Sequence, residues 1–175
     1  MKIAVIGTHG VGKSYFSANL YAHLLKSGRN VTLIEELSRN CPLPMNENTT
    51  KRAQAWILFD QMVREIEEEK RHEIVICDRG VVDNYAYFVR AHGDSRDLDP
   101  VVKYWLPTYD TIYKIRSTTK YLMNDGFRST SEEWQREMDG RLTSILKDFG
   151  VKYVELDSGD WEDAAGSILK SARKN

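Results

Sequence analysis

The sequence predicts an α/β protein in which a parallel β-sheet carries helices on both faces. Two observations predict this class. Short apolar runs rich in Val and Ile alternate with segments of helical periodicity along the chain. A glycine-containing stretch, residues 7–14, joins the first apolar run to the first helical segment. Because 175 residues suffice for one full core, we expect a single domain over residues 1–175.

The strands are expected where β-branched and other apolar residues follow one another directly. They cover residues 2–6, 31–34, 73–77, 111–115 and 151–156. The helices are expected where apolar residues recur every three to four positions between end signals. They cover residues 15–26, 48–72, 81–91, 99–105 and 161–172, and a further helix follows a capping box at 130–133 and ends at Gly150.

Three local features of these helices are also expected. The core-facing stripe of the 48–72 helix follows a period close to 3.6 and consists of Ala53, Trp56, Phe59, Val63 and Ile66. The 99–105 helix begins with Asp99 as its N-cap and Pro100 as its first helical residue. Gly140 costs its helix about 1 kcal/mol relative to Ala. A hinge or close packing would explain this glycine.

Composition excludes several classes of protein. The net charge of −1 gives no electrostatic basis for an obligate nucleic-acid partner. No apolar run approaches the roughly 20 residues of a membrane helix. The first residues lead directly into a strand, so we expect no signal peptide. Cys41 and Cys77 are expected to be thiols rather than a disulfide, which suits the cytoplasm.

Residues 7–14 fit G-x-x-x-x-G-K-[ST], the phosphate-binding P-loop. Gly7 and Gly12 allow successive N–H groups to point into one concavity, and the following helix adds the positive end of its dipole. Lys13 is expected to bind the β- and γ-phosphates, and the Ser14 hydroxyl to bind Mg²⁺. The expected nucleotide-binding residues are Gly7, Thr8, His9, Gly10, Val11, Gly12, Lys13 and Ser14, with Arg128 from a later loop.

Asp78 and Arg79 end the third strand, at the edge where parallel sheets bind ligands. Asp78 is a candidate Mg²⁺ ligand together with Ser14, or the base that receives a hydroxyl proton. The alternative is an aspartate that only caps the next helix. Arg79 is a candidate for holding a phosphate or the acceptor, and the alternative is a surface ion pair.

Four further residues reach the same edge. Glu36 and Arg39 follow the second strand and could bind acceptor hydroxyls or pair with each other. Asp83 and Tyr87 lie one and two turns into the 81–91 helix, so they complete the expected acceptor pocket together with Arg79.

A lid segment is expected near residues 117–137. Its Asp125-Gly126 pair makes a sharp turn that presents Arg128 on a loop. An arginine delivered by a closing lid can stabilise a migrating phosphoryl group while water is excluded. The alternative is an ordinary loop arginine.

With these residues, the chain resembles the P-loop nucleoside and nucleotide kinases. Within them it is most similar to the small ATPase/kinase-like family that includes the ribosylnicotinamide kinase domain. The matching parts are residues 7–14, the E-x-x-R run from Glu36 to Arg39, the strand ending at Cys77-Asp78, and the 125–128 turn with the helix after it.

The resemblance implies a three-layer α/β/α P-loop NTPase with a five-stranded parallel sheet in the order 2-3-1-4-5, and it implies ATP and Mg²⁺ as cofactors. The Asp78-Arg79 pair is similar to the acid–arginine pair that follows the third strand of deoxynucleoside and thymidylate kinases. Gly80 stands where those kinases usually have Ser or Tyr, which implies a differently shaped acceptor site. The lid has no dense arginine cluster, so Arg128 is its main candidate.

The leading hypothesis is an ATP- and Mg²⁺-dependent kinase for a small nucleoside-like or nucleotide acceptor, with Lys13, Asp78 and Arg128 as catalytic residues. A second hypothesis is a regulatory ATPase with slow hydrolysis and a protein partner, because a P-loop alone does not prove a transferase. A GTPase-like switch would need an N-K-x-D guanine motif, which the sequence lacks.

Overall fold

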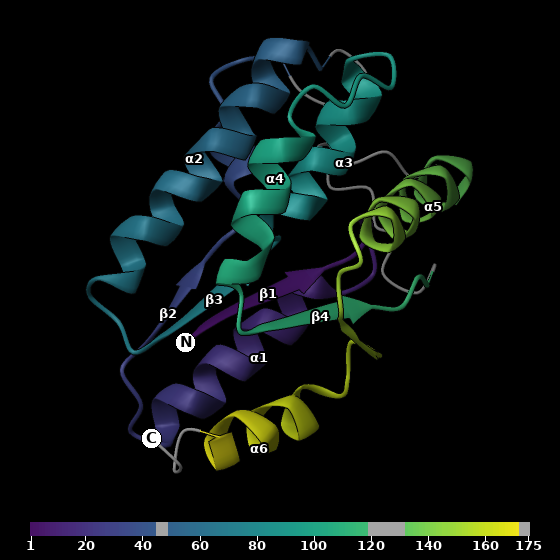
Figure 1. Ribbon diagram of the computed structural model, residues 1–175. Helices are drawn as coiled ribbons and strands as arrows, with labels where there is room; N and C mark the ends of the chain where they lie inside the picture. Colours follow the sequence, from purple (N-terminus) through teal and green to yellow (C-terminus); the bar gives the residue numbers. More distant parts are fainter. Residues whose placement is uncertain (45–48, 119–131, 172–175) are drawn as a thin grey trace.

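The computed structural model describes residues 1–44, 49–118 and 132–171, and its elements alternate between strand and helix (Figure 1). The strands are β1 (Lys2–Ile6), β2 (Val31–Ile34), β3 (Ile74–Asp78), β4 (Thr111–Ile115) and β5 (Val154–Leu156). The α-helices are α1 (Lys13–Lys26), α2 (Lys51–Glu69), α3 (Val81–Ala91), α4 (Asp99–Trp105), α5 (Glu132–Asp148) and α6 (Trp161–Ser171). Among the described residues, short 3₁₀ turns are η1 (Leu37–Asn40) and η3 (Leu106–Thr108).

The five strands form one parallel sheet in the order β2-β3-β1-β4-β5, which confirms the expected topology. β1 lies at the centre, between β3 and β4, with Val5 opposite Asp78. Since all strands run in the same direction, their carboxyl ends share one edge of the sheet. The P-loop and Asp78 therefore leave the sheet side by side.

Helices cover both faces of the sheet, as the three-layer prediction requires. The face with Ile3 and Val5 packs against α1 and α6. The opposite face, with Ala4 and Ile6, packs against α2, α3, α4 and α5. Figure 1 shows α1 and α6 below the sheet and α2, α3 and α4 above it.

The prediction of a core-facing stripe on α2 is wrong, because Ala53 is the only one of its five residues that is buried. Phe59, Val63 and Ile66 are 45–50% exposed. The buried face is rotated toward a second row of residues, which consists of Gln54, Ile57, Leu58, Gln61, Met62 and Glu65. Both rows of α2 contain apolar residues. The second row is the buried one because its polar residues have hydrogen-bond or ion-pair partners inside the protein.

Glu65 is the centre of these internal contacts. It is fully buried and forms an ion pair with Lys2 at 3.1 Å. Its carboxylate also accepts hydrogen bonds from the Trp105 Nε1 (2.7 Å), the Tyr109 hydroxyl (2.6 Å) and the Gln61 Nε2 (2.9 Å). A buried carboxylate with four partners can be accommodated in the core, whereas an unpaired one cannot.

Several expected element ends also shift. α2 begins at Lys51 with Thr50 as its cap, whereas the expected start at 48 lies outside the described residues. Leu98 occupies the N-cap position of α4, so Asp99 is its first helical residue and accepts hydrogen bonds from Tyr85 and Arg96 instead of capping. The capping box at 130–133 lies partly outside the described residues.

The last strand is shorter than expected. β5 holds only Val154–Leu156, because Val151 belongs to the turn after α5 and donates its N–H to the Leu146 carbonyl at 2.9 Å. Val151 also packs against the core on the α5 side of the sheet. An apolar residue that closes a helical turn can thus mimic the start of a strand in the sequence.

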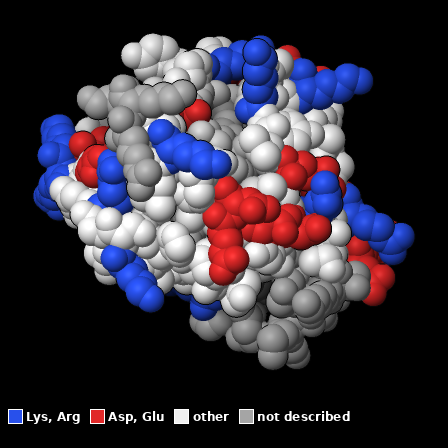
Figure 2. All heavy atoms as spheres, turned by 90° about the horizontal axis from the view of Figure 1, so that it is seen from below, with Lys and Arg blue, Asp and Glu red and all other residues white. Residues whose placement is uncertain are grey.

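Other general expectations can be compared with the described residues. Cys41 and Cys77 are free thiols, as expected. Within the described residues, no helix is both long and apolar enough to cross a membrane. On the face seen from below, acidic side chains gather in a central patch and basic side chains are scattered around it (Figure 2). This face thus presents both signs of charge.

Gly140 is exposed in the middle of α5, and apart from its chain neighbours and the adjacent backbone of α5, no described atom lies within 4 Å of the place where a Cβ would stand. Close packing therefore does not explain this glycine. We expect Gly140→Ala to raise the free energy of unfolding by about 1 kcal/mol, because alanine loses less backbone freedom on folding. Urea unfolding of the purified variant would measure the change.

Gly150, which follows the same helix, provides the matched control. Its φ of +65° is a conformation that alanine adopts only with strain. Gly150→Ala should therefore lower the free energy of unfolding by about 1 kcal/mol. A destabilising Gly140→Ala would show that this glycine is needed for a reason other than helix propensity.

Candidate active site

The P-loop connects β1 to α1, and its backbone conformation depends on glycine. Gly7, Gly10 and Gly12 have φ angles of +143°, +68° and +90°. At Gly7 a Cβ would also lie 2.9 Å from the Ile115 carbonyl oxygen, so no side chain fits there. Gly12 is the N-cap of α1 and offers no capping side chain, so the first N–H groups of the helix are available to an anion.

Lys13 is the first residue of α1 and is 6% exposed. Its Nζ donates to the carbonyl oxygens of Gly7 at 2.7 Å and Thr8 at 2.6 Å. Burial, and to a smaller extent the nearby Arg79, lowers the pKa of Lys13 to about 8. The ammonium is thus held at the P-loop in an environment that disfavours its charge.

Asp78 ends β3 next to the P-loop. Its buried carboxylate lies close to the hydroxyl of the exposed Ser14. Burial raises the pKa of Asp78, and Lys13 and the Ser14 hydroxyl partly oppose this shift. The Oδ1 atom of Asp78 is buried without a hydrogen-bond partner among the described residues. A hydroxyl oxygen beside a free carboxylate oxygen matches the hard oxygen ligands that Mg²⁺ prefers.

Arg79 is the centre of a second group of polar side chains. Its Nε donates to Glu36 Oε1 at 2.8 Å, and its guanidinium lies 5.2 Å from the centre of the Tyr87 ring. Its Nη1 stands 3.7 Å from Asp83 Oδ2. Burial disfavours the guanidinium charge, but Glu36 and the other acidic neighbours outweigh it and raise the pKa of Arg79 well above its usual value.

The structure thus brings together Glu36, Arg79, Asp83 and Tyr87 beside Lys13 and Asp78. The surface ion pair considered for Arg79 is wrong, because Arg79 is 6% exposed and its pair with Glu36 is buried. Ser38 also donates to Glu36, at 3.0 Å. Arg39 is exposed in η1 and is not part of this buried group.

The backbone of Arg79 and Gly80 is tightly constrained. Arg79 has a φ of +99°, an uncommon conformation for a residue with a side chain. A Cβ at Gly80 would lie 2.9 Å from the Cβ of Ala4 in β1. Gly80 therefore stands in this position because α3 begins too close to the central strand for any larger residue.

Arg128 and the 125–128 turn lie outside the described residues, so the role of Arg128 stays a prediction. Sequence reasoning missed Gln135, a buried residue of α5. Its Nε2 donates to the carbonyl oxygens of His9 at 2.9 Å and Thr118 at 3.0 Å, which ties α5 to the P-loop. A polar residue next to the apolar stripe of this helix was the available signal.

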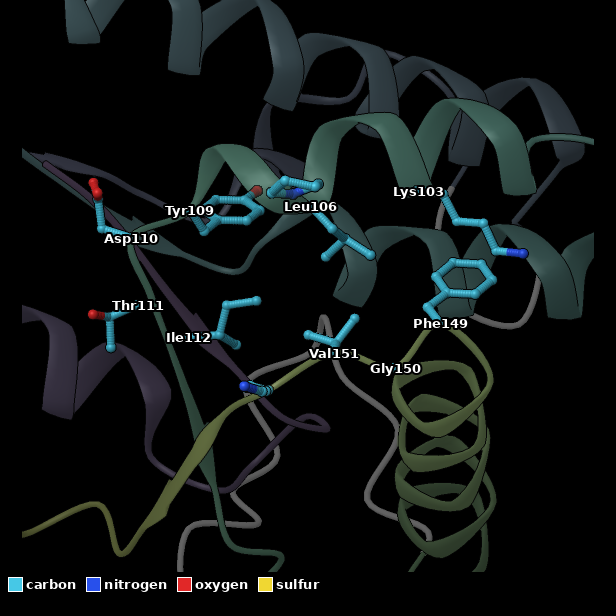
Figure 3. Close-up of a pocket in the computed structure, with 11 residues that line it drawn as sticks. Lys103, Leu106, Tyr109, Asp110, Thr111, Ile112, Phe149, Gly150 and Val151 are labelled. Carbon is cyan, nitrogen blue, oxygen red and sulfur yellow. The ribbon is translucent and has the colours of Figure 1, made fainter.

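A groove of about 470 Å³ lies at the opposite end of the sheet (Figure 3). Its walls come from η3, the start of β4 and the turn after α5, with Leu106, Ile112, Phe149 and Val151 among the lining residues. Thr111 at the amino end of β4 also lines it, whereas the P-loop follows the carboxyl end of β1. The groove is therefore separate from the site at the P-loop.

Comparison with known proteins agrees with this fold. The family described as an AAA domain matches residues 2–164. A search of curated proteins finds no match. Among solved structures, deoxyadenosine kinase from M. mycoides with the products dCMP and dCDP is 19% identical, with a TM-score of 0.63 and complete coverage of both chains.

A second solved structure, the NadR protein in complex with NR, is 22% identical with a TM-score of 0.73. The match covers 97% of this chain but 50% of that chain, so it concerns half of that protein. At these identities the two structures show a shared fold. Because the family match spans nearly the whole chain, the protein belongs to this AAA domain family.

Proposed function

We propose that this protein is an ATP- and Mg²⁺-dependent phosphotransferase that acts on a small nucleoside-like or nucleotide acceptor. The observation that carries the proposal is the buried polar group beside the P-loop. Arg79 Nη1 and Asp83 Oδ2 stand too far apart for a hydrogen bond, and neither atom has another hydrogen-bond partner within the described residues. Buried polar atoms without partners are costly, so we infer that an acceptor completes them.

Each group has a distinct role in the proposed reaction. Lys13 and the N–H groups at the start of α1 bind the phosphates of ATP. Bound Mg²⁺, held by Ser14 and Asp78, would neutralise charge on the β- and γ-phosphates. Glu36 and Asp83 offer carboxylates to acceptor hydroxyls, while the Arg79 guanidinium holds both carboxylates in place. Arg128 is proposed to reach the γ-phosphate from its loop.

The compounds named for the related structures support this acceptor class. Deoxyadenosine kinase has been seen with dCMP, dCDP and dATP, and NadR with NR. We also propose a cytoplasmic location, where the free thiols Cys41 and Cys77 would stay reduced.

The test is ADP release from Mg-ATP with a panel of nucleosides, nicotinamide riboside and nucleoside monophosphates. We expect one acceptor to raise turnover at least about tenfold, a barrier change of about 1.4 kcal/mol. Lys13→Ala should abolish this stimulation. A flat panel above a Lys13-dependent basal rate would contradict the kinase and favour a regulatory ATPase.

If Asp78 and Ser14 hold the same Mg²⁺ ion, substitutions of the two residues should have the same effect on the Mg²⁺ requirement. Asp78→Asn and Ser14→Ala should each raise the Mg²⁺ concentration for half-maximal activity at least about tenfold, because each removes an oxygen that holds the ion. Mg²⁺ titration of the activity measures this. A lower kcat in Asp78→Asn at an unchanged Mg²⁺ requirement would instead assign Asp78 as the base.

The lowered pKa of Lys13 predicts the pH dependence of ATP binding. Phosphate binding favours the protonated lysine, and above pH 8 the free site has lost that proton. Affinity for Mg-ATP should therefore be constant below pH 7.5 and weaken above pH 8, approaching about tenfold per pH unit. Calorimetry on the wild type and Lys13→Ala tests this. If the affinity for Mg-ATP falls equally with pH in both proteins, Lys13 is not the titrating group.

A further inference from the structure

The start of α3 has no capping side chain of its own. The residue at its N-cap is Gly80, and the contact with Ala4 leaves no room for Ser, Thr or Asp there. The first N–H groups of a helix have no partner within the helix. At a buried helix start such as this one, these donors must be satisfied from elsewhere in the protein.

Tyr109 supplies that partner from a distant part of the chain. Its hydroxyl accepts a hydrogen bond from the Val81 N–H at 2.9 Å and donates one to Glu65 Oε1 at 2.6 Å. Tyr109 lies between η3 and β4, 28 residues after Val81. Its ring lies beside Leu106 in the wall of the groove, as Figure 3 shows. One hydroxyl therefore links the start of α3 to α2.

The Glu65 carboxylate, which accepts the hydrogen bond from the Tyr109 hydroxyl, is itself held firmly. Lys2, Trp105 and Gln61 all bind the Glu65 carboxylate, and the Lys2 Nζ also lies 5.0 Å from the centres of the Trp105 and Tyr109 rings. The position of Tyr109 is thus fixed from several directions, so its hydroxyl is a rigid support.

The residues next to Val81 are those of the candidate active site. Arg79 holds its positive φ between two hydrogen bonds: its own N–H donates to the Val5 carbonyl at 3.2 Å, and the Val81 N–H donates to Tyr109. Such backbone conformations are strained and persist only where the surroundings impose them. The first two turns of α3 then carry Asp83 and Tyr87.

We propose that Tyr109 is a positioning residue for the acceptor site. Its hydroxyl caps α3 through Val81 and thereby keeps the Arg79 side chain directed at Glu36 and Asp83. This inference rests on the function proposed above for that site. Tyr109 acts through α3, by way of its hydrogen bond with Val81.

The experiment compares Tyr109→Phe with two matched variants in the full chain. Tyr113→Phe removes another buried tyrosine hydroxyl, one that lies on the α1 face of the sheet. Trp105→Phe removes a different hydrogen bond to Glu65 and leaves Val81 capped. Steady-state kinetics for ATP and for the acceptor, and urea unfolding, are measured for all three.

We expect Tyr109→Phe to raise the KM for the acceptor about tenfold while the KM for ATP changes less than about twofold. The split arises because α3 carries acceptor residues, whereas the P-loop leads into α1. Tyr113→Phe and Trp105→Phe should keep both KM values within about twofold of the wild type. The proposal is overturned if Trp105→Phe raises the acceptor KM as much as Tyr109→Phe does. It is also overturned if Tyr109→Phe changes the acceptor KM no more than Tyr113→Phe does.

A second measurement does not depend on activity. Amide hydrogen exchange at Val81 should be at least about tenfold faster in Tyr109→Phe than in the wild type, and unchanged in Trp105→Phe. Unchanged protection of Val81 in Tyr109→Phe would overturn the proposal. Absence of Lys13-dependent transfer in the wild type would contradict the proposed function instead, and the exchange measurement would still decide the role of Tyr109.

Discussion

The parallel pairing of β1 with β3 is the contact on which the candidate site depends. Val5 lies opposite Asp78, and the next hydrogen bond joins the Arg79 N–H to the Val5 carbonyl. The P-loop and the Asp78-Arg79-Gly80 turn therefore leave the sheet from adjacent positions. α3 begins directly above β1, which explains both the glycine at position 80 and the cap supplied by another part of the chain.

The charges of the site depend on one another because all of them are buried. Burial lowers the pKa of Lys13 and raises the pKa of Asp78, so it favours the neutral form of each side chain. Burial also acts to lower the pKa of Arg79, but Glu36, Tyr87, Asp83 and Asp78 together outweigh it and raise the pKa. A phosphate beside Lys13 and a cation beside Asp78 would compensate both remaining charges. The electrostatics of the site thus suit the Mg-ATP that we propose as its ligand.

The sequence was sufficient for features in which one local pattern decides the outcome. The P-loop and the approach of Asp78 to Ser14 belong to this class. The strand order followed from the family resemblance and not from one local pattern. The sequence was not sufficient for the pair of Glu36 with Arg79, because these two residues are 43 positions apart. Tertiary contacts of this kind, like the cap at Val81, leave no periodic signal in the sequence.

The orientation of α2 shows how strongly the buried polar residues determine the fold. Phe59, Val63 and Ile66 stay about half exposed. Each side chain therefore contributes roughly 1 kcal/mol less hydrophobic stabilisation than it would if it were fully buried. Turning that row inward would move Glu65 and Glu69 away from Lys2 and leave a buried ammonium unpaired, which costs about 3–5 kcal/mol.

The same rotation would also take the carboxylate acceptor from the buried hydroxyl of Tyr109 and the indole N–H of Trp105, at about 1–3 kcal/mol for each unsatisfied group. The polar contacts therefore outweigh the apolar ones. The exposed stripe of α2 is a consequence of the same carboxylate that supports the start of α3.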